Sequence, residues 1–189
     1  MKTYKVRLKS KSPYSQSKHY GKDEVPPLEK ESHEAYEQRT WRNRLHVDKD
    51  GEVFIPPMAL KGCLQDAAKF LSLQIPGKGK QTYTKHFDAG VMVVDELRLG
   101  LHKDEVQAET LYVPSDGKPG GARRVNKTFP LIPSWETEAT IHVIDETITG
   151  DVLKRHLDEA GMLIGMGRFR PRNRGFYGRF DVVSIDEAF

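Results

Sequence analysis

The stretch that most constrains the fold is an amphipathic segment at positions 60–71. Apolar residues recur there at the spacing of one helix face, at Leu60, Cys63, Leu64, Ala67, Ala68 and Leu71. Pro56 and Pro57 come directly before this stripe, and proline is tolerated in the first turn of a helix. The pattern therefore predicts a helix that must bury one side against another element.

Strands and helices alternate twice along the chain. Positions 3–10 alternate apolar and basic residues as a half-buried strand does, and after the helix positions 90–99 indicate a buried strand. A second unit has a strand at 137–144, a helix from 149 or 151 to about 162, and a final strand at 180–185. Two such units can form an antiparallel sheet backed by two helices, so the expected fold class is α+β and ferredoxin-like.

Loops and a hairpin interrupt this pattern. Positions 11–36 are rich in Ser, Pro, Lys and Glu, which predicts a long loop or partly ordered arm. The Asp-Gly turn within 48–51 indicates a hairpin over 45–55, and 111–113 indicates a short strand. We expect one domain, 1–189, with an extended arm at 11–36 and a Gly/Arg-rich loop at 165–179.

Cysteine content and hydropathy exclude several classes of protein. Cys63 is the only cysteine, so an internal disulfide and a multi-cysteine zinc site are ruled out, and its place on the helix face predicts a buried, inert thiol. The N-terminus lacks the apolar segment of a signal peptide, and no apolar run approaches the length of a membrane span. A cytoplasmic protein without a membrane partner is expected.

The segment 165–179 has the most unusual composition. It holds five arginines, four glycines, three aromatic residues and no acidic residue. In an extended conformation Arg168, Arg170, Arg172 and Arg174 would share one face and could follow a row of phosphates, with Arg179 nearby. Phe169, Phe176 and Tyr177 could stack on bases. These features favour nucleic-acid binding, and the competing interpretation is a loop whose arginines are only solvated.

Further basic residues could extend this surface, although each could also be an ordinary surface charge. Lys61 lies in the first turns of the predicted helix, where free N–H groups favour anions. The other candidates precede the helix, follow it, or lie in a later glycine-rich loop: Arg42, Arg44, Lys78, Lys80, Arg123 and Arg124. Glu34 and Glu37 are near enough in the sequence to pair with Arg42 and Arg44.

The segment Phe54-Ile55-Pro56-Pro57-Met58-Ala59-Leu60-Lys61-Gly62 resembles a signature of the backbone-subunit group in the CRISPR RAMP superfamily, with Pro57-Met58 in place of Gly-Ser. Trp41-Arg42-Asn43-Arg44, the turn at 48–51 and the loop at 165–178 occur in the order found in that family. The resemblance implies a ferredoxin-like, RNA-recognition-type fold and binding of guide RNA. It also implies side-by-side assembly on RNA or membership of a CRISPR ribonucleoprotein, and the chain is short for such a subunit.

The expected partner is single-stranded RNA, with single-stranded DNA as an alternative, bound by a homo-oligomer or by a subunit of a larger ribonucleoprotein. In this interpretation the arm at 11–36 contacts the strand or a neighbouring subunit. The ribonucleoprotein could belong to a host CRISPR system, or the chain could be a mobile-element mimic of one. Neither a Walker loop nor a dinucleotide fingerprint occurs, and we expect no cofactor.

Two other functions remain open. A small RAMP endoribonuclease that processes guide RNA would need a general base, for which His19, His33 or His46 is a candidate, assisted by Tyr20 or a lysine. Metal-dependent cleavage has weak candidates in Glu31 and Glu34, and His86 with Asp88 lacks a third ligand, so no metal site is expected. Alternatively, the Arg/aromatic loop could bind an acidic protein surface as an interaction module.

Overall fold

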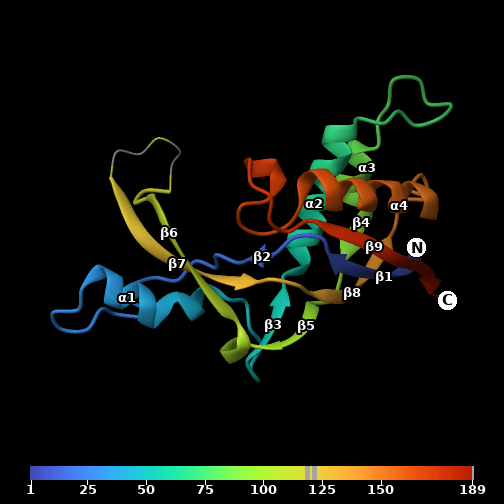
Figure 1. Cartoon of the computed structure of the whole chain (residues 1–189). Coiled ribbons are helices and arrows are strands. Elements are labelled where there is room, and N and C mark those ends of the chain that lie inside the picture. The colour runs from blue at the N-terminus through green and yellow to red at the C-terminus, as the bar shows by residue number, and fades with distance from the viewer. Residues whose placement is uncertain (118–119, 121–122, 189) are drawn as a thin grey trace.

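Four antiparallel strands form the central sheet of the structure, a computed structural model that describes residues 1–117, 120 and 123–188 (Figure 1). In space they follow the order β4 (Val91–Val93), β8 (Glu136–Val143), β1 (Lys2–Ser10) and β9 (Phe180–Ala188). Helices α2 (Pro57–Leu71) and α4 (Gly150–Glu159) link them in the chain order β1-α2-β4-β8-α4-β9. This combination of chain order and spatial order is ferredoxin-like, so the predicted fold class is confirmed.

The two helices cover one face of this sheet. The predicted apolar stripe of α2 is buried from Leu60 to Ala68, and the alternation in β1 places Tyr4, Val6 and Leu8 in the same core. Leu153 and Leu157 of α4 complete the contact. The Cys63 thiol is buried among these side chains, and burial raises its pKa to about 12. None of the helices in the described ranges has both the length and the apolar character that crossing a bilayer requires.

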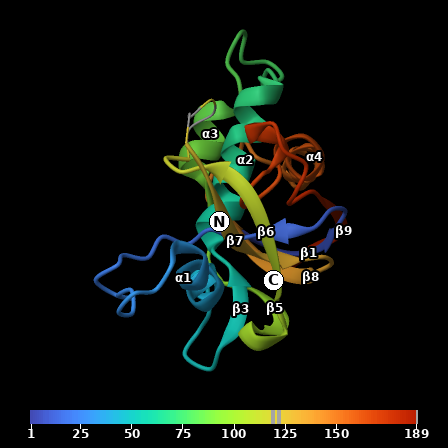
Figure 2. The same ribbon diagram turned by 60° about the vertical axis from the view of Figure 1, so that its left-hand side comes forward.

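Two smaller sheets extend from this body. One has the order β2 (Tyr14–Ser15), β7 (Arg124–Ile132) and β6 (Gln107–Pro114), and the other pairs β3 (Glu52–Ile55) with β5 (Leu97–His102). Helix α1 (His33–Thr40) and the short helix η1 (Trp41–Arg44) pack against β7. Figures 1 and 2 show α1 at the opposite end of the molecule from the loop between α2 and α3 (Thr84–Gly90). The other short elements are η2 (Lys103–Glu105), the π-helical η3 (Ala160–Ile164) and η4 (Pro171–Asn173).

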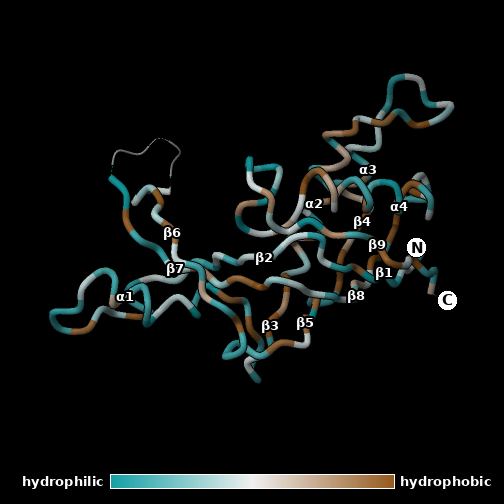
Figure 3. Tube along the Cα trace, viewed as in Figure 1, coloured by the Kyte–Doolittle hydropathy of each residue, from teal (hydrophilic) through white to brown (hydrophobic). Residues whose placement is uncertain are grey.

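The arm at 11–36 is irregular for most of its length and ends in α1. The Ser32 hydroxyl accepts a hydrogen bond from the Ala35 N–H and caps this helix, and the Tyr36 hydroxyl donates to the Val25 carbonyl at 2.8 Å. Figure 3 shows that the segment around α1 is mostly hydrophilic. Polar contacts therefore contribute much of what holds the arm in place.

Several sequence predictions were wrong in detail. The single strand expected at 90–99 is two strands, because the chain leaves the central sheet after Val93 and β5 pairs with β3. The hairpin expected over 45–55 keeps its turn, but its two sides are joined by a single bridge, between Val47 and Val53. The more extensive partner of β3 is β5. Helix α3 escaped prediction because Phe87 is its one buried apolar side chain, which leaves no periodic stripe to recognise.

Candidate nucleic-acid interface

A cleft of about 1210 Å³ opens between the arm, the β6–β7 hairpin and the start of the Gly/Arg-rich loop. It exceeds the usual ~300–1,000 Å³ of a small-molecule site and suits a segment of a polymer. Several residues predicted from the sequence line it together, although they are far apart in the chain: His19, Tyr20, His33, Arg44, Arg124, Arg168 and Phe169. The fold therefore brings the arm and the Gly/Arg-rich loop to one site.

The cleft carries a surplus of positive charge. Of the residues that the structure describes, two carboxylates line the cleft and both are paired, Glu37 with Arg44 at 2.9 Å and Glu31 with Arg39 at 2.8 Å. The hydrogen bonds from Arg39 are the main reason that the pKa of Glu31 is lowered to about 2. Among the described residues, four further cations at the cleft have no ion-pair partner: Lys18, Lys22, Arg124 and Lys127. Such unpaired cations suit a polyanionic ligand.

The Gly/Arg-rich loop is folded back on itself and is not extended, so its arginines do not form the predicted row on one face. Pro171 starts the short helix η4, and Phe169 and Arg174 both have left-handed backbone, with φ of 56° and 65°. The Met166 N–H donates to the Gly178 carbonyl at 3.0 Å, and the Tyr177 N–H donates to the Phe169 carbonyl at 2.9 Å. These bonds close a compact loop, and a bond from the Gly178 N–H to the Pro13 carbonyl at 2.7 Å attaches it to the segment that includes β2.

A glycine is required where the two ends of this loop meet. Gly178 has φ of 74°, and a Cβ there would clash with the Met166 carbonyl oxygen. Only glycine allows the two ends of the loop to approach this closely, because any side chain at position 178 would push them apart.

Arg168 is held inside the wall of the cleft. Its guanidinium contacts Glu109 on β6, with Nη2 at 3.2 Å from Oε2, and its Nε donates to the Ser15 hydroxyl at 3.2 Å. The same group lies over the Phe129 ring at 3.7 Å and over the Phe169 ring at 4.3 Å. Burial is the main reason that its pKa is lowered. These contacts occupy Arg168, so it builds the surface and is not a free phosphate ligand.

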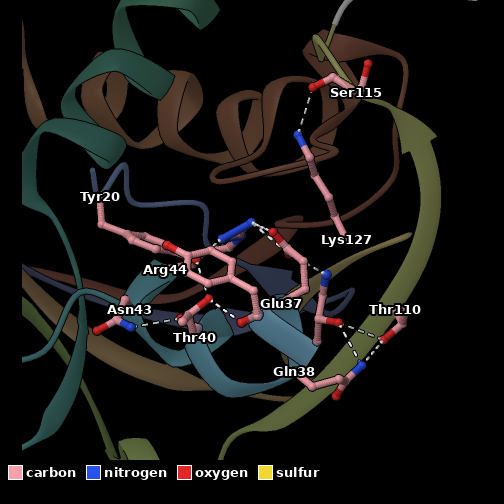
Figure 4. A network of polar contacts seen from close by, with 11 residues as sticks. Tyr20, Glu37, Gln38, Thr40, Asn43, Arg44, Thr110, Ser115 and Lys127 are labelled. Carbon is pink, nitrogen blue, oxygen red and sulfur yellow. Dashed lines mark hydrogen bonds and ion pairs between the residues drawn. The ribbon is translucent and has the colours of Figure 1, made fainter. Parts of the chain in front are cut away.

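Arg44, whose Cζ lies 5.2 Å from the centre of the Phe129 ring, has a similar role. Its Nη2 donates to both carboxylate oxygens of Glu37, at 2.9 and 3.1 Å, and its Nη1 donates to the Tyr20 hydroxyl at 2.9 Å (Figure 4). The Thr128 N–H on β7 also donates to Glu37, at 3.1 Å. This network joins the arm, η1 and β7, so Arg44 supports the wall of the cleft.

The other predicted binding residues lie outside the lining of the cleft. Lys61 is buried and donates to the Phe87 and Asp88 carbonyls, the latter at 3.0 Å. Exposed positions hold Arg42, Arg123, Arg172, Arg174 and Phe176, and Lys78 and Lys80 lie in the exposed loop after α2. Arg42 stacks on Trp41, and Arg179 donates to the Met162 carbonyl at 2.9 Å. Arg170 lies 3.9 Å from Asp66, and Tyr177 is buried.

The open face of the central sheet is a poor platform for bases. The outward side chains of β1 pair with carboxylates of β8, Arg7 with Glu136 at 3.1 Å and Lys5 with Glu138 at 3.4 Å. Paired charges on this face leave little potential for phosphates. The cleft is therefore the better candidate.

The residues considered for catalysis have different environments. His19 and His33 are both exposed and line the cleft, whereas His46 is half-buried beside Phe54, and burial lowers its pKa. Glu34 is exposed. His86 contacts Asp145 at 2.6 Å. Within the described part of the chain, no cluster of three His, Cys, Asp or Glu side chains is arranged to hold a metal ion.

Five residues of the cleft or its supporting wall were not predicted from the sequence: Lys18, Lys22, Glu109, Lys127 and Phe129. Lys127 and Phe129 lie two positions apart on β7, so their side chains share one face of that strand. A strand with side chains alternating at period two over 124–132 was the signal that could have revealed Lys127 and Phe129.

Neither a protein-family model nor a curated protein matches this sequence. Among solved structures, the chain is similar to one in the cryo-EM structure of the Type III-B Cmr-beta bound to cognate target RNA, at 13% identity and a TM-score of 0.50. That match covers 98% of this chain but only 60% of the other, so this chain spans less than two thirds of it. The crystal structure of Cmr6 from Pyrococcus furiosus is similar at 13% identity and a TM-score of 0.49, covering 96% of this chain and 98% of that one. The chain therefore shares its fold with this Cmr-beta chain, and its strand order is the ferredoxin-like one that the resemblance in its sequence implied.

Proposed function

We propose that this chain binds single-stranded RNA in the cleft, as a RAMP-type subunit of a CRISPR-related ribonucleoprotein. The observation that carries the proposal is the cleft itself, where unpaired cations and the exposed ring of Phe169 face one space. Cations would hold the phosphates, and an aromatic ring suits an unpaired base. Cmr-beta, whose chain shares the fold, was solved with target RNA bound, which favours RNA over DNA as the ligand.

Fluorescence anisotropy with matched single-stranded RNA and DNA across a salt series tests this proposal. The double variant Lys18→Ala/Lys127→Ala should weaken RNA binding and flatten the plot of log affinity against log salt by about 1.4, since each lost phosphate contact removes ~0.7 for single strands. The matched control is Lys78→Ala/Lys80→Ala, which removes the same charge from exposed positions outside the cleft. Equal effects of the two double variants, or no RNA binding at low salt, would reject the cleft as the site.

A second candidate function is metal-independent RNA cleavage. It is favoured by the presence of two exposed histidines, His19 and His33, on the same cleft as the cations. A histidine there could remove the proton of a 2′-hydroxyl in a bound strand. Incubation of labelled RNA with wild-type protein, His19→Ala and His33→Ala in EDTA tests it. Cleavage that is lost in a histidine variant while binding persists would establish the enzyme, and intact RNA throughout would leave a binding protein.

A further inference from the structure

Five side chains in the wall of the cleft form a series of contacts in which aromatic rings alternate with guanidinium groups. In order they are Tyr20, Arg44, Phe129, Arg168 and Phe169. The Arg44 Cζ lies 5.2 Å from the ring centres of both Tyr20 and Phe129. The Arg168 Cζ lies 3.7 Å from the Phe129 centre and 4.3 Å from the Phe169 centre. We name this set the cleft ladder. All five members line the cleft.

Carboxylates outside the stack neutralise both guanidinium groups. Arg44 contacts Glu37 at 2.9 Å, and Arg168 contacts Glu109 at 3.2 Å. The planar edge of a guanidinium can bind a carboxylate while its faces stay on aromatic rings. The guanidinium groups of the cleft ladder therefore need no bound anion to balance their charge. The group that the ladder presents to a ligand is the aromatic ring at its end.

Phe169 is that end. One face of its ring covers Arg168, and Tyr177 meets it edge-on at 6.2 Å and 71°. The residue is nevertheless 42% exposed and lines the cleft. Its backbone is left-handed, with φ of 56°, a conformation that a phenylalanine rarely adopts. Hydrogen bonds from the Tyr177 N–H to the Phe169 carbonyl and from the Arg168 N–H to the Ser15 carbonyl, both at 2.9 Å, hold it there.

We propose that the open face of Phe169 is a subsite for one unstacked nucleobase, which becomes the next member of the cleft ladder. This inference rests on the proposed function, because the base belongs to a strand whose phosphates face the cations of the cleft. A nucleobase fits this surface because it is flat, and its π-face needs no hydrogen-bond partner from the protein. The subsite should accept all four bases, since the ring presents no polar atom that could read a base edge.

The same loop provides a matched control. Phe176 is 56% exposed and also touches Tyr177, with ring centres 4.6 Å apart, but it does not line the cleft and is not part of the ladder. Any general effect of removing an exposed ring from this loop should therefore occur in both Phe169→Leu and Phe176→Leu. Loss of the subsite should occur only in Phe169→Leu.

Anisotropy with a 12-nucleotide RNA tests the subsite. Phe169→Leu should weaken binding about tenfold with an unchanged salt dependence, because stacking on one base contributes ~1–3 kcal/mol and 1.4 kcal/mol is tenfold. Phe176→Leu should bind within about twofold of wild type, and Phe169→Tyr, which keeps the ring, should restore binding. If the wild-type protein binds RNA and Phe169→Leu binds equally well, the subsite is rejected while the proposed function stands. If the wild type binds no RNA, the proposed function itself fails.

Photocrosslinking keeps the test decisive if Phe169→Leu does not fold. Wild-type protein is irradiated with RNA that carries 5-iodouridine at each position in turn, and the adducts are mapped by mass spectrometry. The proposal expects Phe169 as the main adduct, at one or a few positions of the strand. Adducts that form on Phe176 and not on Phe169 would overturn it.

Discussion

The Tyr177 hydroxyl donates a hydrogen bond to Glu109 Oε1 at 2.6 Å, and this contact ties the end of the Gly/Arg-rich loop to strand β6. Because Glu109 also contacts Arg168, one carboxylate holds both a tyrosine and an arginine of the loop. The position of the loop against the β6–β7 hairpin depends on this carboxylate.

Tyr177→Phe should destabilise the fold. It removes the hydroxyl donor to a charged acceptor, and such hydrogen bonds contribute ~1.5–3 kcal/mol. Thermal unfolding followed by circular dichroism measures the loss. Tyr112→Phe is the control, because Tyr112 is 62% exposed and its hydroxyl makes no hydrogen bond among the described residues. An equal change in both variants would show that the contact with Glu109 does not stabilise the protein.

Alkaline pH should weaken the same contact. Burial, with the hydrogen bond to Glu109, raises the pKa of Tyr177 to about 12, whereas an unfolded tyrosine ionises near ~10. In the folded state the Tyr177 hydroxyl stays protonated to a higher pH than in the unfolded chain. The stabilisation is therefore fully present below pH ~10 and is lost as pH rises towards 12. Urea unfolding at pH 9 and pH 11 should show a smaller loss of stability in Tyr177→Phe than in wild type. The same loss in both would contradict the assignment.

Acid pH should act through His156. This side chain is 1% exposed, stacks on Phe87 at 4.2 Å, and has a pKa lowered by burial. The unfolded chain binds the proton more readily, so stability is fully present above pH ~6.5 and falls as the pH drops through the folded pKa. Melting temperatures between pH 8 and pH 5 should fall more steeply for wild type than for His156→Phe. His19→Phe, which alters an exposed histidine, should follow wild type.

Gly178→Ala and Gly77→Ala separate backbone strain from steric clash. Both glycines have positive φ, 74° and 76°, but a Cβ at Gly77 meets no atom within 4 Å, whereas one at Gly178 clashes with the Met166 carbonyl oxygen. Gly77→Ala should cost ~1–2 kcal/mol of stability from the left-handed backbone alone. Gly178→Ala should cost clearly more and weaken RNA binding. Similar unfolding midpoints in urea would show that the loop can open without penalty.

Lys61→Met distinguishes the role predicted from the sequence from the one its contacts indicate. In the structure the ammonium group bonds to two carbonyls at the end of α3, so the variant should lose ~1–3 kcal/mol of stability and keep its RNA affinity below the melting temperature. Weaker RNA binding with unchanged stability would instead support Lys61 as an RNA ligand. Unfolding and anisotropy on the same preparation decide between them.

Local patterns account for what the sequence predicted. The stripe in α2 and the alternation in β1 and β8 depend on neighbours within a few positions, so they identified the two-layer body. The cleft depends on partners far apart in the chain. Arg168 and Glu109 are 59 positions apart, and a row of arginines in a sequence does not show which of them a carboxylate will occupy. Arg168 and Arg44 thus became parts of the wall, while, within the ranges that the structure describes, the cations without an ion-pair partner came from positions such as Lys18 and Lys127.

The cleft ladder also bears on the order of events during synthesis. Its members lie at positions 20, 44, 129, 168 and 169, so a chain growing from its N-terminus cannot complete the ladder until position 169 has emerged. Contacts of such high sequence separation form late and slowly. A nascent or truncated chain that stops before position 168 would have the arm and the β6–β7 hairpin but no finished wall. The site is therefore complete only shortly before β9 is available to pair with β1.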